Sequence, residues 1–356
     1  MRIAFVSFET VHHRETETNA RARTVVDLLV AGGHDVDVVT TKWWSGEHDT
    51  FELGGVTYHA IADDRESGRT FLAKLPVTIA RLGPDVVHAV ATPPSVVRAA
   101  NWGATLARSP LVVEWYGEAG VVDDRAPRKV TRWADRIVTP SRLVRTWVRE
   151  LGAAGDAVEV IPSPIDLDLV RETPPVDEAD ASEVIYARRL DAEANLESLL
   201  LALAELRDRD WRATVVGDGP ERDRYESLTA DLRIDDRVRF VGETSREERV
   251  AIYRAGHAFV QTADFCVFPT ELCWALAAGC VGVVEYHADS SAHELVEGRE
   301  RGIRTTSETE LTEAIVAAGR LEHREYDEYG ERFGQRQVRE RYLDVYRELQ
   351  AEGGLF

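Results

Sequence analysis

ATVVGDGP, residues 213–220, is a short apolar run that ends in a glycine-rich turn. Residues 221–232 follow with a helical composition, so the stretch predicts a strand, a tight turn and a helix in succession. Gly217 and Gly219 allow a sharp turn, and Pro220 suits the start of a helix. Because short apolar strands that alternate with helices are typical of βαβ units on a parallel sheet, this stretch predicts the α/β class.

The same alternation runs through both halves of the chain, and a length of 356 residues favours two domains. Between the halves, residues 171–183 are polar, acidic and proline-bearing. We therefore predict two Rossmann-like domains with parallel sheets that face a central cleft, at 1–168 and 184–325, with a linker at 169–183. A helix within 326–356 is expected to pack back across both domains. Strands are expected at 2–8, 35–40, 85–90, 111–116, 136–140, 158–162, 183–188, 213–220, 238–242, 258–262 and 281–286.

The composition describes a strongly acidic protein. There are 63 Asp and Glu against 43 Lys and Arg, a net charge of -20, and only three of the basic residues are lysine. Acid excess with few lysines favours a halophilic protein, since exposed carboxylates hold water and concentrated salt screens their repulsion. An ordinary acidic protein from a GC-rich genome is the alternative. The charge argues against nucleic-acid binding.

Membrane-spanning and metal-binding classes find no support in the sequence. No apolar run approaches the roughly 18 residues that cross a bilayer, and Met1 leads directly into a core strand, so we expect a cytoplasmic protein. Cys266, Cys273 and Cys280 form no CxxC pair and have no histidines at ligand spacing. We expect them to be core residues, and we expect neither a metal nor a cofactor.

Two motifs in the second half suit a bound diphosphate. Arg188 and Arg189 end a predicted strand, where alternation directs one side chain to the cleft and the other to solvent. A guanidinium offers forked donors to phosphate, although a surface role is equally compatible with an arginine-rich chain. The turn at Gly217, Asp218 and Gly219 exposes amides that favour anions, although any tight strand-to-helix turn requires glycine.

DFCVFPTELCWALAAGC, residues 264–280, predicts a helix that starts near Thr270. Glu271 lies in its first turn, where the helix dipole favours a carboxylate and would equally favour a phosphate. Trp274 follows three residues later, so Glu271 and Trp274 share one face of the helix.

Residues 125–149 contain eight basic residues and one acid. Such a segment is typical of a patch that docks on an anionic lipid surface or on a phosphorylated lipid acceptor, with Arg128, Lys129 and Arg132 as its centre. The alternative is that these arginines pair with acids elsewhere in the chain.

Taken together, the chain resembles the family-4 glycosyltransferases of GT-B fold, which are retaining enzymes with nucleotide-sugar donors. The resemblance implies that the second domain holds the nucleotide and diphosphate while the first receives the acceptor. It also implies that no metal is needed, because positive side chains and helix amides offset the charge of the leaving diphosphate. The motifs that carry it fall in family order, at DVVH (85–88), ADRIVTPS (134–141), VIPSPID (160–166), ARRL (187–190), VVGDGPER (215–222), VRFVGE (238–243) and ALAAGC (275–280).

By this resemblance Arg189 is the diphosphate-binding arginine, and Gly217 and Gly219 lie near the nucleotide. The chain departs from the family at several positions. Thr16-Glu17 replace a Gly-Gly loop near the donor phosphates, Tyr116 stands where the family has an active-site histidine, Ala194 stands where it has a lysine, and Cys266 and Trp274 replace the two signature glutamates.

Glu271 lies one turn before Trp274 and could reach the hydroxyls that the absent glutamate would hold. We therefore expect an active transferase that moves a sugar to a glycan or lipid-phosphate-linked acceptor, with peripheral contact at the cytoplasmic face of the membrane. A non-catalytic nucleotide-sugar-binding subunit is the alternative, and a GT-B epimerase fits the interdomain and ALAAGC segments less well. The catalytic candidates are Arg189, Glu271 and Tyr116, and the donor-binding candidates are Arg188, Gly217, Asp218, Gly219, Thr270, Trp274, Thr16 and Glu17.

Overall fold

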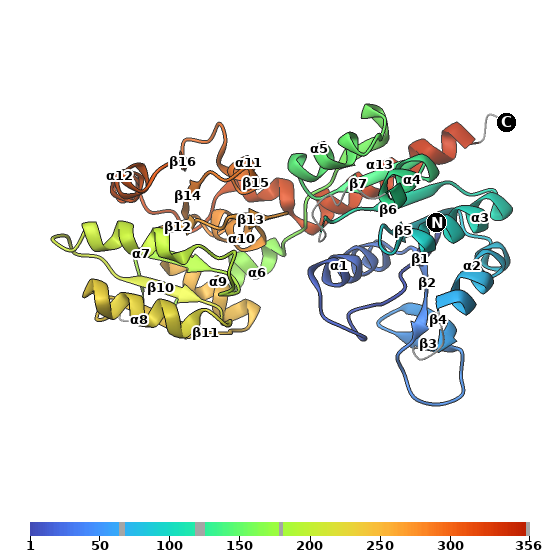
Figure 1. Cartoon of the computed structure of the whole chain (residues 1–356), viewed down its shortest axis with the longest axis horizontal. Helices are drawn as coiled ribbons and strands as arrows, with labels where there is room; N and C mark the ends of the chain where they lie inside the picture. Colours follow the sequence, from blue (N-terminus) through green and yellow to red (C-terminus); the bar gives the residue numbers. More distant parts are fainter. Residues whose placement is uncertain (64–67, 118–124, 178–180, 354–356) are drawn as a thin grey trace. The chain divides into compact units, whose positions relative to one another are not determined.

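The computed structural model describes residues 1–63, 68–117, 125–177 and 181–353. The chain forms two α/β units, each built on its own parallel sheet, as the alternating pattern predicts (Figure 1). The first unit comprises Met1–Ser163 together with the C-terminal segment from Arg336, and the second comprises Pro164–Gln335. Residues 169–183, where we expected a linker, therefore count with the second unit.

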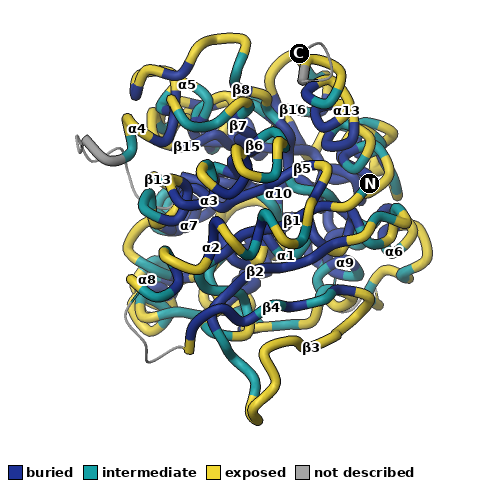
Figure 2. The backbone as a smooth tube through the Cα atoms, turned by 90° about the vertical axis from the view of Figure 1, so that its right-hand side faces the viewer, coloured by how far each residue is buried: buried dark blue, intermediate teal, exposed yellow. Residues whose placement is uncertain are grey.

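The first unit contains an eight-stranded sheet in the order β3-β4-β2-β1-β5-β6-β7-β8. All neighbouring strands are parallel except β3, which runs antiparallel to β4. The central strands are buried on both faces, which explains their nearly continuous apolar sequences, whereas β3 is exposed along its length (Figure 2). The strands are β1 Arg2–Val6, β2 Asp35–Lys42, β3 Thr50–Leu53, β4 Val56–Asp63, β5 Val86–Val90, β6 Leu111–Glu114, β7 Arg136–Thr139 and β8 Val158–Val160.

The strand order determines which helices share a face of this sheet. The crossover from β1 to β2 runs in one direction, while those from β4 to β5 and onward to β8 run in the other. Because parallel crossovers are right-handed, α1 lies on one face and α2, α3, α4 and α5 lie on the opposite face. The helices are α1 Glu17–Ala31, α2 Gly68–Leu82, α3 Pro94–Ala107, α4 Arg125–Trp133 and α5 Arg142–Glu150.

The C-terminal helix α13, Gln335–Gly353, packs on the same face as α1. Its buried residues Val338, Tyr342 and Tyr346 share one core cluster with Val25 and Leu29 of α1. The segment before it, which includes the 3₁₀ helix Glu328–Phe333, belongs to the core of the second unit. The terminal segment 326–356 therefore contributes residues to both units.

A buried ion pair ties α13 to the first unit. The Arg21 guanidinium donates to the Glu114 carboxylate at 2.7 Å, and neither side chain is more than 3% exposed. Arg21 also donates to the Tyr342 hydroxyl at 3.0 Å, and that hydroxyl donates to the second Glu114 oxygen at 3.0 Å. Further bonds from Arg21 to Ser163 and to a backbone carbonyl give each of the three guanidinium nitrogens an acceptor, as a buried charge requires.

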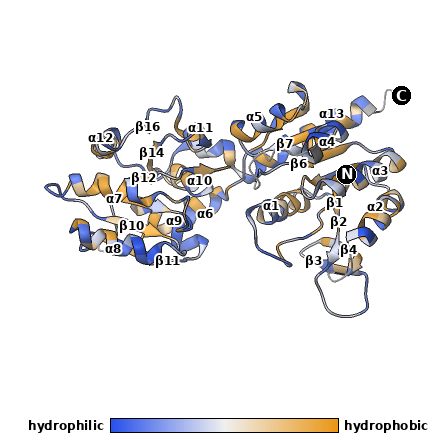
Figure 3. Ribbon diagram, viewed as in Figure 1, coloured by the Kyte–Doolittle hydropathy of each residue, from blue (hydrophilic) through white to orange (hydrophobic). Residues whose placement is uncertain are grey.

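The second unit contains a six-stranded sheet in the order β11-β10-β9-β12-β14-β16, with all pairs parallel. Its strands are β9 Val184–Ala187, β10 Ala213–Val216, β11 Val238–Gly242, β12 Ala258–Gln261, β14 Val281–Glu285 and β16 Gly302–Thr305, and a small separate sheet pairs β13 Phe265–Cys266 with β15 Asp289–Ser290. Its helices are α6 Leu167–Glu172, α7 Leu196–Glu205, α8 Arg222–Leu232, α9 Arg246–Ala255, α10 Thr270–Ala277, α11 His293–Val296 and α12 Glu308–Ala318. The mostly apolar α7 contributes six buried residues to this core (Figure 3).

Candidate functional site

The arginine pair and the glycine turn lie side by side at the carboxyl ends of β9 and β10. Gly217 has φ +120°, and a Cβ on it would overlap the Arg188 carbonyl oxygen. A Cβ on Gly219 would overlap the Leu190 carbonyl oxygen. The Leu190 amide donates to the Asp218 carbonyl at 2.9 Å and holds the two segments together. Both glycines are thus required by the close approach of two backbones, whether or not a ligand is bound.

The two arginines have different surroundings. The Arg188 guanidinium donates to the Phe265 carbonyl at 3.1 Å and lies 3.4 Å from the Asp191 carboxylate. Arg189 is exposed, and its guanidinium has no hydrogen-bond or ion-pair partner within the described segments. Strand alternation predicted that one side chain faces the cleft and the other faces solvent, whereas β9 ends at Ala187 and both arginines follow it. Arg188 is held by the protein, and Arg189 is available to an anion at the strand end.

Arg188 also connects this edge to the segment before α10. Phe265, whose carbonyl it contacts, lies in β13 together with Cys266, the position of the first signature glutamate. α10 begins at Thr270, whose amide donates to the Phe268 carbonyl at 2.9 Å. The donor-site candidates of the second unit therefore lie on adjoining segments.

The Glu271 carboxylate is occupied by three donors from α9. Arg246 donates at 2.7 Å, Arg249 at 2.9 Å and the Tyr253 hydroxyl at 2.6 Å. Burial alone would raise the pKa of Glu271, but Arg246, Tyr253 and Arg249 outweigh it and hold that pKa below its usual value. Glu271 therefore joins α9 to α10.

Trp274 takes part in the same contact. It is buried, and the Arg246 guanidinium lies 4.8 Å from its ring centre. Glu271 and Trp274 thus share a helix face as predicted, and that face meets α9. A sequence signal for these partners existed, because positions 246, 249 and 253 fall on one side of a helix.

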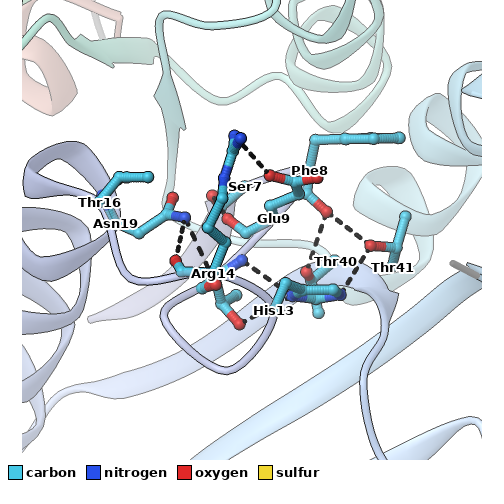
Figure 4. Close-up of polar contacts among 10 residues, drawn as sticks. Ser7, Phe8, Glu9, His13, Arg14, Thr16, Asn19, Thr40 and Thr41 are labelled. Carbon is cyan, nitrogen blue, oxygen red and sulfur yellow. Dashed lines mark hydrogen bonds and ion pairs between the residues drawn. The ribbon is translucent and has the colours of Figure 1, made fainter. Parts of the chain in front are cut away.

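In the first unit, Thr16 and Glu17 begin α1. The Thr16 hydroxyl accepts the Asn19 amide at 3.1 Å, which is a common helix N-cap. The Asn19 side chain in turn donates to the carbonyls of Arg14 at 2.9 Å and Thr10 at 3.4 Å. These bonds, drawn in Figure 4, hold the loop where the related family has two glycines.

His13 fastens the same loop to the sheet. Its Nδ1 accepts the Thr10 amide at 3.0 Å, and its Nε2 lies 2.9 Å from the Thr41 hydroxyl. Thr41 donates to the Phe8 carbonyl at 2.8 Å (Figure 4). Because Nδ1 accepts, we assign the ring proton to Nε2, which then donates to Thr41. His13 could not be recognised from the sequence, because a single histidine in a loop has no distinctive spacing.

A cavity of about 280 Å³ opens beside this loop. It is lined by Ser7, Phe8, Glu9, Arg14, Thr16, Thr18, Asn19, Val90, Thr92 and Pro93. Arg14 and Glu9 form an ion pair at 3.1 Å in this lining. The mixture of hydroxyl, amide and charged groups suits a small polar ligand.

Tyr116, the third catalytic candidate, lies in the interior of the first unit. Only 5% of it is exposed, and the Arg21 guanidinium carbon lies 5.8 Å from its ring centre. It therefore borders the ion pair between Arg21 and Glu114.

The three basic candidates are exposed on α4. Lys129 and Arg132 have no ion-pair partner in the part of the chain that the structure describes, whereas Arg128 makes a further interaction. α4 packs against α3.

Neither a membrane-spanning helix nor a metal site occurs within residues 1–63, 68–117, 125–177 and 181–353. None of the helices there combines the length and apolar character that a bilayer crossing requires. No group of three His, Cys, Asp or Glu side chains in those ranges is arranged to hold a metal ion.

Family models match both halves of the chain. A model described as "Glycosyltransferase Family 4" matches residues 19–169, and one described as "Glycosyl transferases group 1" matches residues 174–333. Between them they span most of the sequence.

Curated relatives match over part of their length. A 2-deoxystreptamine glucosyltransferase of Streptomyces kanamyceticus is 32% identical over 143 residues, which is 35% of this chain and 37% of that protein. An alpha-monoglucosyldiacylglycerol synthase of Streptococcus pneumoniae is 25% identical over 235 residues, which is 59% of this chain and 52% of that protein. The matched part thus spans about a third to a half of these relatives.

Solved structures match over nearly the whole chain. A sucrose-phosphate synthase from Thermosynechococcus elongatus has a TM-score of 0.71 at 20% identity, with 99% of each chain covered. Anabaena HepE in complex with UDP has a TM-score of 0.73 at 16% identity, with 98% of this chain and 100% of that chain covered. At such identities the likeness establishes the fold. With both halves matched by the family models and the architecture shared, the chain belongs to the family-4 glycosyltransferases of GT-B fold.

Proposed function

We propose that this protein transfers a sugar from a nucleotide-sugar donor to a glycan or lipid-linked acceptor, with retention of anomeric configuration and without a metal ion. The observation that carries the proposal is the exposed guanidinium of Arg189, which has no partner among the described residues and lies beside the turn at Gly217 and Gly219. Membership of a glycosyltransferase family supplies the class of reaction.

The proposed role of Arg189 follows from the charge that develops during transfer. When the bond between the sugar and the diphosphate breaks, negative charge accumulates on the leaving group. The Arg189 guanidinium and the positive end of the α8 dipole, which follows the glycine turn, would offset this charge. This electrostatic contribution is what would replace a metal ion.

The donor and acceptor are proposed from the relatives. HepE is described in complex with UDP and with UDP-glucose, so uridine diphosphate sugars are the first donors to test. The names of two relatives specify 2-deoxystreptamine and a diacylglycerol lipid. We propose that the protein acts in the cytoplasm, at the membrane face where its acceptor is lipid-borne.

The test is turnover of nucleotide sugars in concentrated potassium chloride, with free nucleotide as the product measured. We expect release of UDP that requires an acceptor and falls at least tenfold in Arg189→Ala. If Arg189→Ala released UDP as fast as the wild type, at both saturating and limiting donor concentrations, the proposed role of Arg189 would be contradicted.

A second candidate function is a non-catalytic nucleotide-sugar-binding subunit. It is favoured by the substituted signature positions Cys266 and Trp274 and by the engagement of Glu271 with Arg246 and Arg249. A thermal-shift panel of nucleotide sugars separates the two functions. Stabilisation by a nucleotide sugar with no nucleotide release, across soluble and lipid-linked acceptors, would favour the binding subunit.

A further inference from the structure

The negative charge of the chain is concentrated in the second unit. That unit contains 20 Lys and Arg against 38 Asp and Glu, whereas the first contains 23 against 25. The first unit is therefore close to neutral, with a net charge of -2 beside -18 for the second. Because acids barely outnumber basic residues in the first unit, a surface there that is rich in basic residues keeps a positive local charge.

Within the first unit, the basic residues gather on one face of the sheet. The crossover rule places α2, α3, α4 and α5 together on that face. These helices contain 11 Lys and Arg and a single acid, Glu150. The basic residues are Arg69, Lys74, Arg81, Arg98, Arg125, Arg128, Lys129, Arg132, Arg142, Arg145 and Arg149. The basic segment seen in the sequence is thus the last part of a larger surface.

Most of these charges are unpaired. Arg69, Lys74, Arg81, Arg98, Lys129, Arg132, Arg145 and Arg149 have no ion-pair partner among the residues whose placement the structure gives. All of these eight are exposed except Arg145, which is half-buried. This observation weakens the alternative that the arginines of 125–149 form ion pairs with acids elsewhere in the chain.

Large apolar side chains are exposed on the same helices. Trp102 is 56% exposed and Leu106 63% exposed, one turn apart on α3, and Val77 of the adjoining α2 is 47% exposed. The Arg98 guanidinium lies 5.6 Å from the Trp102 ring centre. The face therefore combines apolar anchors with a surrounding field of positive charge.

We propose that this face, defined by the exposed residues of α2, α3, α4 and α5, docks on an anionic lipid bilayer. Basic residues are attracted to anionic headgroups, and tryptophan is favoured at the boundary between headgroups and acyl chains. A nucleic acid would be attracted by the basic side chains but would not account for the exposed Leu106 and Val77. The inference rests on the proposed function only in making the acceptor lipid-borne.

The two components of the surface respond differently to salt. At about 0.1 M salt the Debye length is about 10 Å, and at about 1 M it is about 3 Å, so the attraction of the basic residues is screened in concentrated salt. The burial of Trp102, Leu106 and Val77 is not screened in this way. Docking in concentrated salt therefore depends on the apolar anchors, and in dilute salt on both components.

The experiment measures co-sedimentation of the whole chain with vesicles, without turnover. Vesicles of phosphatidylcholine alone are compared with vesicles that contain about one third phosphatidylglycerol, in 0.1 M and 2 M potassium chloride. We expect at least tenfold tighter binding to the anionic vesicles in 0.1 M salt. Arg128→Glu/Lys129→Glu/Arg132→Glu should abolish this preference, and Trp102→Ser/Leu106→Ser should weaken binding at both salt concentrations.

A matched control carries the same charge change on the second unit. Arg209→Glu/Arg304→Glu/Arg320→Glu reverses three exposed arginines and should leave vesicle binding within twofold of the wild type. Circular dichroism and melting temperature establish that each variant is folded. Equal binding to both vesicle types, or an equal loss in the control variant, would overturn the proposal.

Other occupants are distinguished in the same experiment. Preferential binding to a DNA duplex, insensitive to Trp102→Ser/Leu106→Ser, would overturn the proposal in favour of a nucleic acid. A dimer in solution, broken by the α4 charge reversal, would overturn it in favour of a second copy. Nucleotide release on a soluble acceptor is measured in parallel. A wild-type protein that binds neither kind of vesicle but still releases nucleotide would refute the docking surface and leave the proposed function standing.

Discussion

Glu271 accepts hydrogen bonds from Arg246, Arg249 and Tyr253, and its removal would leave two arginines without their carboxylate. We predict that Glu271→Ala lowers the free energy of unfolding by about 3 kcal/mol, because breaking a largely buried ion pair strands the remaining charge. Tyr253→Phe removes one donor and should cost about 1 kcal/mol. Urea denaturation of the three proteins measures both values.

A second substitution of Glu271 tests the expectation that its carboxylate contacts the donor. If the carboxylate binds nucleotide-sugar hydroxyls, Glu271→Gln weakens donor binding about tenfold, or near 1.4 kcal/mol, at an almost constant melting temperature. Calorimetry on the folded variant measures this affinity. If Glu271→Gln kept its donor affinity but melted at a lower temperature, the role of Glu271 would be only structural, as the link between α9 and α10.

Arg189 and Arg188 give a matched pair of substitutions. A charged hydrogen bond to phosphate contributes about 1.5–3 kcal/mol, so Arg189→Ala should lose roughly 10- to 100-fold in donor affinity or turnover. Arg188→Ala should instead lower stability, because Arg188 holds the Phe265 carbonyl. A greater loss of turnover in the Arg188 variant would show that the assignment is off by one residue.

At this scale, the sequence could identify candidates but not their partners. It predicted that one of Arg188 and Arg189 faces the cleft and the other faces solvent, because strand alternation has a fixed period, and this stays a prediction. It placed no weight on Arg21, whose partner Glu114 lies far along the chain. Long-range pairing depends on tertiary packing and leaves no local pattern to read.

Among the elements, α13 depends on the buried carboxylate of Glu114. Burial alone would raise the pKa of Glu114, but Arg21 and His88 outweigh it and lower that pKa from its ordinary 4.5. The folded-state pKa therefore lies below the unfolded one, so the contribution of Glu114 to stability is present above pH 4.5 and is lost as pH falls through the folded value.

We predict that Glu114→Gln is less stable than the wild type at pH 7 and loses less stability between pH 6 and pH 3. Urea unfolding at several pH values measures the slope, and hydrogen exchange of α13 locates the effect. Asp49→Asn, at an exposed position, is the control and should follow the wild-type slope. Parallel pH dependence of Glu114→Gln and wild type would exclude the ion pair as the source.

The helices and strands were the most predictable level. All five strands expected in the second half are present, because buried parallel strands are short apolar runs bounded by turns. β3, β4, β13, β15 and β16 were missed. β3 is exposed and carries no apolar run, and β13 and β15 have two residues each. Residues 169–183 looked like a linker by composition, yet Leu167–Glu172 form α6 and bury Leu167 and Val170.

For the molecule as a whole, motifs that occur in the order typical of the family predicted the GT-B architecture. The total composition did not show how charge is distributed between the two units. A net charge of -20 suggests a uniformly acidic surface, but the sum combines a nearly neutral unit with one at -18. The distribution follows the boundary between the units. Residues 1–163 contain 19 basic and 21 acidic residues, and the segment from Arg336 onward adds four of each to the first unit.

This asymmetry predicts how stability responds to salt. Self-repulsion in the second unit should be relieved as the Debye length falls from about 10 Å in 0.1 M salt to about 3 Å in 1 M salt. We therefore expect hydrogen exchange of the core amides in β9, β10 and β12 to slow several-fold between these concentrations of potassium chloride. The amides of β1 and β5 should change less than twofold.

Neutralising exposed acids should reproduce part of this effect without salt. Asp231→Asn/Asp235→Asn/Asp236→Asn removes three negative charges from exposed positions of the second unit. In 0.1 M salt this variant should exchange its β9 and β10 amides more slowly than the wild type, and it should gain less from added salt. Equal slowing of both units in the wild type would instead point to a general effect of salt on apolar burial, because that effect does not depend on local charge. The halophilic interpretation would then lose its electrostatic basis.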